Sequence, residues 1–330
     1  MADSSIQWTD KVWNPTIGCS RVSAGCGDGA VKGGGCYAER MAHRLATMPH
    51  TKDLYAGLTR MTKGGPRWTG EVKLVADRLA DPLGWKKPQK IFVNSMSDLF
   101  HEALTNEQIA AVFGVMAAAP QHQFQILTKR AERMRNWFAW VKADELDPLR
   151  SVCREASCII GSPAIHGRSW TETLDGALWP LPNVWLGVSA EDQPTADERI
   201  PLLLATPAAV RWVSAEPLLG PIRFAMPAVS DPPEDVPTKP LANAEEWDDW
   251  KYWAARDRGL SWVVVGSESG PGARPMDVAW ARAIVDQCFI ARVAVFTKQI
   301  ATPEGKAHGD PKGGDPQYWP PYDWPREFPR

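Results

Sequence analysis

The chain lacks any long hydrophobic run. No stretch approaches the roughly 18 apolar residues that a membrane-spanning helix needs. The start, Met1-Ala-Asp-Ser-Ser-Ile-Gln-Trp8, also lacks the basic segment and apolar core of a secretory signal. We therefore expect a cytoplasmic protein that makes no use of a membrane.

Cysteine is scarce, with six in 330 residues. Half of the cysteines lie close together near one end, which is unlike the dense and even spacing of a secreted disulfide framework. In a reducing cell this usage favours metal ligands or catalytic thiols. Cys288 lies in an amphipathic helical pattern, and we expect it in the core.

An excess of charge of one sign is also missing. The 37 basic and 39 acidic side chains give a formal charge of −2, which excludes the strong basic excess of a surface that tracks nucleic-acid phosphates but leaves room for local basic patches. Tryptophan, by contrast, is abundant, with 17 residues. We interpret these side chains as core and loop-packing aromatics rather than as platforms for base stacking.

Three cysteines, Cys19, Cys26 and Cys36, lie within eighteen residues in a glycine-rich segment that leads into a helical pattern. Three thiolates are one ligand short of a closed structural zinc or iron site. A metal centre with three protein ligands keeps one coordination position open for chemistry. This spacing is the strongest indication of function in the chain.

A second pattern recurs along the sequence: short β-rich apolar runs end in polar residues and are followed by helical or loop segments. The runs cover residues 91–98, 124–130, 184–192, 210–217, 262–269 and 293–299. Buried parallel strands have this composition. Helices are predicted from Thr105, which suits a helix N-cap, from Ala131, and from Asp277 to Ile290.

Repeated βα units predict an α/β fold with a parallel sheet, in which active sites lie at the carboxyl ends of the strands. Polar side chains at those ends are expected to converge on one mouth. They are Asn94, Ser95, Asp98, Lys129, Arg130, Ser189, Glu191, Asp192, Ser214, Glu216, Ser267, Glu268 and Lys298.

Three stretches interrupt the repeat. Residues 141–182 form an irregular segment, residues 223–260 are rich in proline and acidic side chains, and residues 301–330 form a Gly/Pro/Trp-rich tail. We interpret the first two as insertions in a single barrel domain of residues 1–300, and the third as a C-terminal tail.

Several ordered motifs run from residue 6 to about residue 299. They include Trp13-Asn-Pro-Thr-Ile-Gly-Cys19, Cys36-Tyr-Ala-Glu-Arg-Met, Phe92-Val-Asn-Ser-Met-Ser-Asp-Leu-Phe100, Leu127-Thr-Lys-Arg130, Trp185-Leu-Gly-Val-Ser, Ser214-Ala-Glu-Pro-Leu-Leu-Gly220 and Gly266-Ser-Glu-Ser-Gly-Pro-Gly-Ala-Arg-Pro275. In these motifs the chain resembles a largely uncharacterised, phage-associated three-cysteine-motif family, whose members are similar to radical S-adenosylmethionine (SAM) enzymes.

The resemblance implies a partial or complete (β/α) TIM-like barrel of the radical SAM type, with insertions. It also implies that Cys19, Cys26 and Cys36 hold a 4Fe–4S cluster whose open iron binds SAM, and that an electron donor such as flavodoxin or ferredoxin reduces the cluster. The gap between Cys26 and Cys36 holds nine residues, more than in the family it resembles. Small flexible residues close such a loop at little cost.

Candidate ligands for SAM follow from the same resemblance. Asn94, Ser95, Ser97 and Asp98 follow an early strand, where radical SAM enzymes bind the methionyl amino group. Lys129 and Arg130 suit a carboxylate or a phosphate. Glu216 and Glu268 suit a ribose hydroxyl or substrate, or else ordinary capping, and Ser189 and Lys298 complete the predicted cofactor-binding set.

Other metal assignments stay open. The clustered cysteines could bind zinc instead, with His43 as the fourth ligand. Cys153 and Cys158, with His166 downstream, form a second candidate metal site, although two cysteines at this spacing are more often incidental.

The leading functional hypothesis is a SAM-cleaving enzyme that modifies a nucleic acid base or a nucleotide. Lys129, Arg130, Arg274 and Lys298 would then form a basic rim for a phosphorylated substrate. One alternative is a non-catalytic zinc or iron–sulfur module that acts with a partner protein. Another is a metal-dependent hydrolase or nuclease, which would need convergent carboxylates rather than thiolates.

Overall fold

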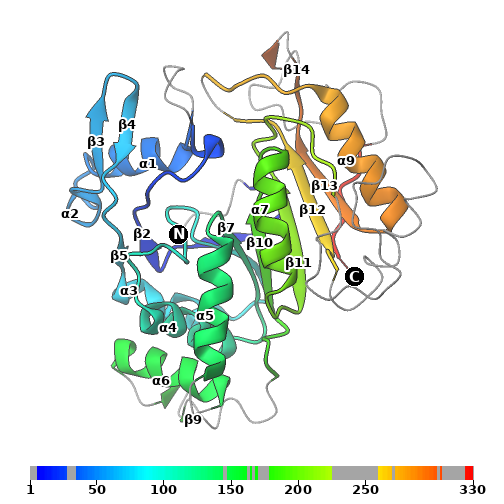
Figure 1. Cartoon of the computed structure of the whole chain (residues 1–330). Coiled ribbons are helices and arrows are strands. Elements are labelled where there is room, and N and C mark those ends of the chain that lie inside the picture. Colours follow the sequence, from blue (N-terminus) through cyan, green and yellow to red (C-terminus); the bar gives the residue numbers. More distant parts are fainter. Residues whose placement is uncertain are drawn as a thin grey trace. The chain divides into compact units, whose positions relative to one another are not determined.

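The structure is a computed structural model of the whole chain (Figure 1). It describes residues 6–27, 35–143, 147–161, 164–165, 168–169, 178–224, 259–269, 272–302, 305–306 and 324–329. The chain divides into two compact units. Unit 1 comprises Met1–Val22, Cys36–Gly187 and Thr206–Ala209, and unit 2 comprises Ser23–Gly35, Val188–Ala205 and Val210–Arg330.

Unit 1 contains the first strands of a parallel sheet. They are β1 (Lys11–Trp13), β6 (Lys90–Val93), β7 (Gln123–Thr128) and the start of β10 (Val184–Ser189). β6 pairs in parallel with both β1 and β7, and the N–H of Phe124 donates to the carbonyl of Asn183, just before β10 (2.8 Å). The sequence pattern does not predict β1, because three residues give no periodic apolar run.

Three long helices of unit 1, α4 (Asn106–Ala117), α5 (Ala131–Ala143) and α6 (Pro148–Ile160), lie together in Figure 1. The predicted cap at Thr105 is confirmed, because its side chain accepts from the N–H of Gln108 and the Gln108 side chain accepts from the N–H of Thr105. α5 begins at Ala131 as predicted. Short elements of this unit are α3 (Ala76–Leu79), the 3-10 helix Asp81–Gly84, and the pair β8 (Ala164–Ile165) and β9 (Arg168–Ser169).

The prediction of an irregular segment over residues 141–182 is wrong for its first part. α6 has a capping Asp147, a proline at its first position and a left-handed Gly161 at its end, which are ordinary helix signals. It packs closely on α4, since a Cβ at Gly114 would lie 2.2 Å from the carbonyl oxygen of Val152. The insertion is therefore partly a core helix.

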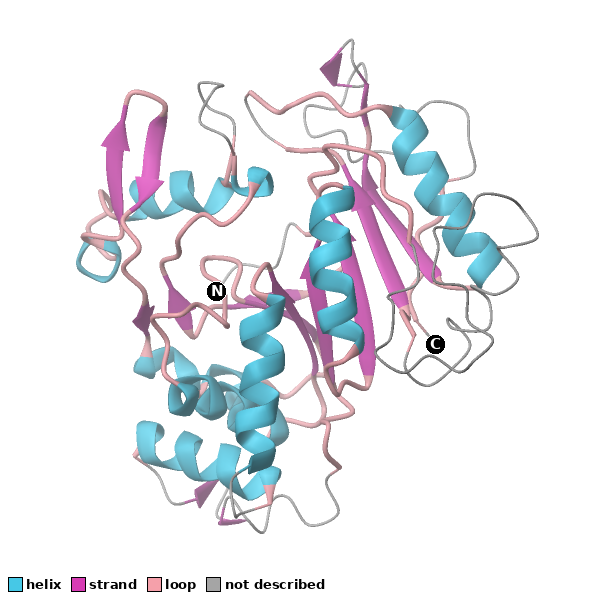
Figure 2. Cartoon of the chain, in the orientation of Figure 1, coloured by secondary structure: helices cyan, strands magenta, loops and turns pink. Residues whose placement is uncertain are grey.

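A separate part of unit 1, residues 37–73, forms what we term the 37–73 lobe. It consists of α1 (Tyr37–Leu45), α2 (Lys52–Tyr55) and the antiparallel hairpin of β3 (Thr59–Thr62) and β4 (Gly65–Trp68). Figure 2 shows the two arrows of this hairpin beside α1. An apolar cluster that includes Tyr55, Leu58 and Trp68 holds the lobe together. β2 (Thr16–Ile17) and β5 (Lys73–Leu74) pair at its edge.

Unit 2 contains the end of β10 and the strands β11 (Val210–Ala215), β12 (Trp262–Gly266) and β13 (Ala294–Gln299). β12 pairs in parallel with both β11 and β13. Its long helices are α7 (Gln193–Leu204), which contacts β11, and α9 (Val278–Ala291), which contacts β12 and β13. Short elements are the 3-10 helix Ala24–Cys26 and the pair β14 (Ala301–Thr302) and β15 (Gly305–Lys306). From the predicted tail of residues 301–330, the structure describes β14, β15 and residues 324–329. The backbone of Pro325 and Glu327 bonds to β13.

The strand order is β1-β6-β7-β10-β11-β12-β13. All six predicted strands are present, so the α/β class with a parallel sheet is confirmed; the radical SAM type of barrel and the single domain of residues 1–300 stay predictions. The core interpretation is confirmed for Trp13, Trp137, Trp212 and Trp262, which are fully buried. No helix in the described ranges is both long enough and apolar enough to cross a membrane.

Candidate metal and ligand site

Two of the clustered cysteines, Cys19 and Cys36, belong to unit 1 and share one environment. Both are half-buried, neither forms a disulfide, and both pack against the apolar cluster of the 37–73 lobe. Cys36 occupies the N-cap position of α1, where the exposed N–H groups of the first turn favour negative charge. A partly shielded pair of thiols of this kind suits a soft metal.

A glycine determines how the chain enters Cys19. Gly18 has a φ of +89°, and a Cβ there would lie 2.1 Å from the carbonyl oxygen of Glu71. Its N–H donates to the carbonyl of Met96 (3.1 Å). Only glycine fits this position, so the direction of the backbone at the first thiol depends on it.

Arg130, which follows β7, contacts Cys19 directly. Its Nη1 donates to the Cys19 Sγ (3.8 Å) and to Asp98 (3.2 Å), its Nε donates to Glu102 (2.9 Å), and its Nη2 donates to the Oγ (2.8 Å) and carbonyl of Ser20 (3.2 Å). These contacts occupy all five N–H groups. Burial alone would lower the pKa of Arg130, but the negative charges of Asp98, Cys19 and Glu102 raise it above its ordinary value.

Asp98 joins the ends of β6 and β7. Its Oδ1 accepts from the N–H of Phe100 (3.0 Å) and the hydroxyl of Thr128 (2.7 Å), and its Oδ2 accepts from the N–H of Lys129 (3.0 Å) and from Arg130. The carboxylate is buried and bound by four donors. The side-chain polar atoms of Asp98 and Arg130 therefore form hydrogen bonds within the protein. Their assignment as ligands of SAM stays a prediction.

Asn94, at the end of β6, has unused hydrogen-bonding capacity. It is 3% exposed and has a φ of +66°, which is unusual for a residue other than glycine. Its Oδ1 accepts from the N–H of Thr16 (3.4 Å), whereas its buried Nδ2 has no partner within the described part of the chain. An unpaired buried donor is costly, and this one lies where the sequence predicts ligand binding. A ligand oxygen or ring nitrogen would satisfy it.

The two neighbouring serines have protein partners. The Ser95 hydroxyl donates to the side chain of Asn14 (3.3 Å), and the Ser97 hydroxyl bonds to the hydroxyl (2.7 Å) and carbonyl (2.9 Å) of Thr16. These bonds tie the segment after β6 to the segment that leads to Cys19. Lys129 is half-buried, and its backbone N–H is the one that Asp98 binds.

Cys26 belongs to unit 2, where acidic residues hold its loop by the backbone. The N–H of Gly25 donates to Glu191 (3.0 Å), and a Cβ at Gly25 would lie 2.8 Å from that carboxylate. Glu191 is fully buried and forms an ion pair with Arg199 (3.1 Å), on α7. The Glu191 carboxylate thus accepts a hydrogen bond from the Cys26 loop, and Arg199 neutralises its charge.

Glu268 and Arg274 form a second attachment for the same loop. The Arg274 N–H and side chain donate to both oxygens of Glu268 (2.8 to 3.0 Å), and the Arg274 Nη1 donates to the carbonyl of Ala24 (2.8 Å). Burial alone would raise the pKa of Glu268, but the bonds and charge of Arg274, with one from the backbone of Gly35, hold this pKa below its usual range. Together the two side chains contact both sides of the gap between Cys26 and Cys36.

The remaining predicted residues of unit 2 form their own group. Lys298 forms an ion pair with Glu216, and the Ser189 hydroxyl donates to the Glu216 carbonyl (3.3 Å). With Arg130 and Arg274 also bound to carboxylates, three of the four residues of the predicted basic rim are neutralised. Asp192 is the N-cap of α7, and its side chain accepts from the N–H of Thr195.

Sequence reasoning missed a histidine beside the first thiol. The N–H of Ala103 donates to the Nδ1 of His101 (3.1 Å), so Nε2 carries the proton and donates to the hydroxyl of Ser20 (2.9 Å). Burial, with the charge of Arg130, lowers the pKa of His101. Its place three residues after Asp98 is the only sequence signal for this position.

The alternative metal ligands lie elsewhere. His43 has its Nδ1 3.3 Å from the hydroxyl of Thr59. Cys153 is buried in α6, where burial raises the pKa of its thiol to about 12, and Cys158 on the same helix is exposed; His166 lies outside the described residues. Cys288 is fully buried, which confirms it as a core residue. Among the residues that the structure describes, no group of three or more His, Cys, Asp or Glu has the geometry of a metal site.

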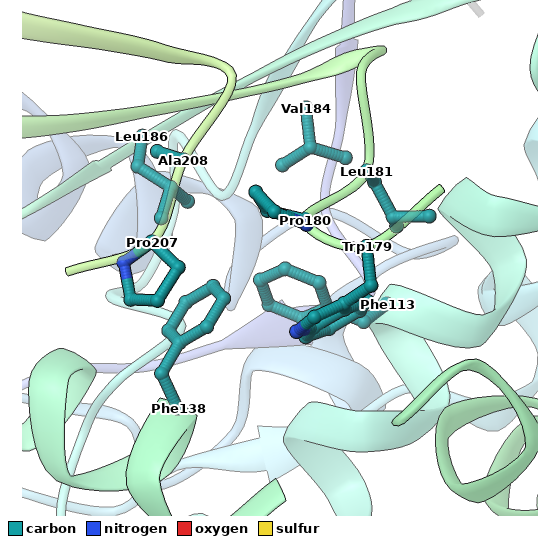
Figure 3. Close-up of a pocket in the computed structure, with 9 residues that line it drawn as sticks. All are labelled: Phe113, Phe138, Trp179, Pro180, Leu181, Val184, Leu186, Pro207 and Ala208. Carbon is teal, nitrogen blue, oxygen red and sulfur yellow. The ribbon is translucent and has the colours of Figure 1, made fainter. Parts of the chain in front are cut away.

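A pocket in unit 1 has a different character (Figure 3). It lies at the start of β10, away from the carboxyl ends of the strands. Its lining consists of Phe113, Phe138, Trp179, Pro180, Leu181, Val184, Leu186, Pro207 and Ala208. Apart from the indole N–H of Trp179, the side chains of that lining are apolar, and none of them is charged or nucleophilic.

Comparison with known proteins gives one match. The model of a family described as "Protein of unknown function (DUF5131)" matches residues 3–313. No curated protein and no solved structure matches the chain.

Proposed function

We propose that this chain, which belongs to that family of unknown function, is an iron–sulfur enzyme of the radical SAM type. Cys19, Cys26 and Cys36 would hold a 4Fe–4S cluster, with SAM at the open iron. A nucleic acid base or nucleotide is the proposed substrate. When bound, the cluster supplies one electron for the reductive cleavage of SAM.

One observation carries the proposal: residues that are distant in sequence form hydrogen bonds with the segments that bear the cysteines. Arg130 binds the sulfur of Cys19, whereas Glu191 and Arg274 bind the backbone next to Cys26. Buried charged groups are costly unless they are paired and hydrogen-bonded, so these contacts hold the cysteine-bearing segments firmly. By contrast, Cys288 is fully buried in the core, and burial raises the pKa of its thiol.

Asn94 supports a ligand beside the thiols of unit 1. Its buried Nδ2 donor, without a partner in the described residues, would pair with a carboxylate oxygen or a base nitrogen of SAM. Arg130 would hold the sulfur, and Asp98 would fix Arg130. In this arrangement the chain's own residues orient the ligand and shield it from water.

A nuclease or hydrolase fits less well. Asp98, Glu191, Glu216 and Glu268 each form an ion pair with a lysine or arginine. Carboxylates that hold divalent ions would instead have to direct their oxygens at the metal. A zinc-binding module that acts with a partner protein uses the same thiols, and the Asn94 donor favours the enzyme over it.

SAM cleavage tests the proposal. The anaerobically purified chain would be loaded with iron and sulfide, reduced with dithionite or with flavodoxin or ferredoxin, and incubated with SAM. Mass spectrometry should detect 5′-deoxyadenosine, and Asn94→Ala should raise the KM for SAM while leaving the iron content unchanged. A reduced, fully loaded protein that neither binds nor cleaves SAM would contradict the proposal and favour the binding module.

A further inference from the structure

The charge of the chain is unevenly distributed. Residues 37–73 contain seven lysines and arginines but three acidic residues, whereas the whole chain contains 37 basic and 39 acidic residues. The rest of the chain is therefore acidic. The 37–73 lobe is therefore basic, although the formal charge of the whole chain is −2.

Four of these cations are exposed. Arg44 lies in the last turn of α1, Lys52 begins α2, Arg60 lies on β3, and Lys63 lies in the hairpin turn. None of the four has an ion-pair partner among the residues that the structure describes. Two carboxylates of the lobe are already used: Glu39 is buried against Arg21 and Arg67, and Glu71 pairs with Lys73.

The hairpin contains a like-charge pair. Arg60 lies directly opposite Arg67 in the β3–β4 register, an arrangement that destabilises a hairpin when nothing offsets it. Glu39 lies 3.8 Å from Arg67 and offsets one of the two charges. Arg60 would gain most from an external anion.

The lobe also carries an exposed aromatic next to a thiol. Tyr37 follows Cys36 at the start of α1 and is 47% exposed, with its hydroxyl donating to the Met96 sulfur (3.7 Å). Exposed aromatics beside cations are how single-stranded nucleic acids are bound: bases stack, and phosphates meet lysine and arginine. A membrane surface would require a continuous apolar face, whereas the apolar side of α1 is packed into the cluster.

We propose that the 37–73 lobe binds single-stranded nucleic acid, with its phosphates on Arg44, Lys52, Arg60 and Lys63 and a base on Tyr37, next to Cys36. The inference names the substrate class and in that choice rests on the proposed function. Strand binding itself needs no cluster. Charges on the lobe thus take the place of the predicted rim, of which Arg130, Arg274 and Lys298 are neutralised.

The test measures binding of a fluorescent single-stranded deoxyoligonucleotide by anisotropy, over a series of salt concentrations. The full chain is compared with a double variant, Arg60→Ala/Lys63→Ala. Each lost phosphate contact should reduce the steepness of the salt dependence by about 0.7, so the pair should reduce it by about 1.4. Tyr37→Leu should weaken binding at least about fivefold without changing that slope.

The matched control is Lys86→Ala/Lys87→Ala, which removes two exposed lysines of unit 1 outside the lobe. It should leave the slope unchanged, and equal melting temperatures would show that all variants fold. An equal loss in both double variants would overturn the proposal, as would tighter binding to duplex or to anionic phospholipid vesicles. Cys36→Ser should still bind the oligonucleotide. Loss of the cluster and loss of oligonucleotide binding are therefore separate results, the first of which bears on the proposed function and the second on the lobe.

Discussion

The two units hold their cysteines in different ways. In unit 1 a cation contacts the sulfur itself, since Arg130 donates to Cys19. In unit 2 the contacts go to the backbone beside Cys26: Gly25 donates to Glu191, and Arg274 donates to Ala24. The first arrangement acts on the charge of a thiol, whereas the second acts on where a thiol is placed.

This difference teaches which substitutions should change thiol chemistry and which should change only structure. Removing the contact at Cys19 alters the electrostatics of one sulfur. Removing a contact at the Cys26 loop leaves its sulfur chemistry alone but loosens the segment that carries it. The following experiments separate these two effects.

The largest effect is expected for Glu191→Ala. It would leave Arg199 buried without its partner, which typically costs about 3–5 kcal/mol. Glu102→Ala removes the exposed partner of Arg130 (64% side-chain exposure) and should cost at most about 1 kcal/mol. Urea unfolding of both variants checks this order, and equal losses would remove the distinction between the buried and exposed pairs.

Arg130→Lys should have the next largest effect. Lysine keeps the charge but cannot reach Asp98, Ser20 and Cys19 at once, so stability should fall by about 1.5–3 kcal/mol. Alkylation of Cys19, mapped by mass spectrometry, should become slower because the guanidinium no longer favours the reactive thiolate. Arg274→Lys serves as control and should leave the alkylation of Cys19 unchanged; an equal change there would refute a direct action on the sulfur.

Gly25→Ala should act on unit 2 alone. Its Cβ would lie 2.8 Å from the Glu191 carboxylate, and such overpacking costs about 1–3 kcal/mol. Gly84→Ala is the matched control, because no atom lies within 4 Å of a Cβ at that position. If thermal unfolding showed the two variants to be equally stable, the close approach of the loop to Glu191 would be wrong.

The smallest effect is expected on the stability of the chain at low pH. Because the pKa of Glu268 is lowered in the folded chain, its stabilisation is present above the ordinary glutamate pKa of about 4.3 and is lost as the pH falls through the folded value. In Glu268→Gln, the free energy of unfolding should therefore fall less between neutral pH and about pH 3 than it does in the unchanged chain, as urea unfolding at each pH would show. An identical pH profile for the variant would mean that Glu268 contributes nothing through its charge.

The sequence predicts the sheet well because buried parallel strands are apolar throughout. The runs that start near Ile91, Phe124 and Val184 all form strands. It fails for α6, although Asp147 at the start of this helix and Gly161 at its end are ordinary helix signals. Short elements such as β1 carry no pattern at all.

Side-chain roles were harder to predict than strand positions. Strand ends place polar residues correctly, but they do not reveal which of them pair with one another. Glu268 is bound by Arg274, and Lys298 by Glu216, so charge that looks available in the sequence is neutralised in the fold. Asn94 is the reverse case: the sequence does not show that its buried side-chain N–H lacks a partner among the residues that the structure describes.

The most direct test of the account is the metal content of the anaerobically reconstituted chain and its cysteine variants. We expect about four irons and four sulfides per chain. Cys19→Ala, Cys26→Ala and Cys36→Ala should each lose the cluster, whereas Cys153→Ala, Cys158→Ala and Cys288→Ala should keep it. Stoichiometric zinc without sulfide, or a normal cluster in Cys36→Ala together with its loss in Cys153→Ala, would contradict the account.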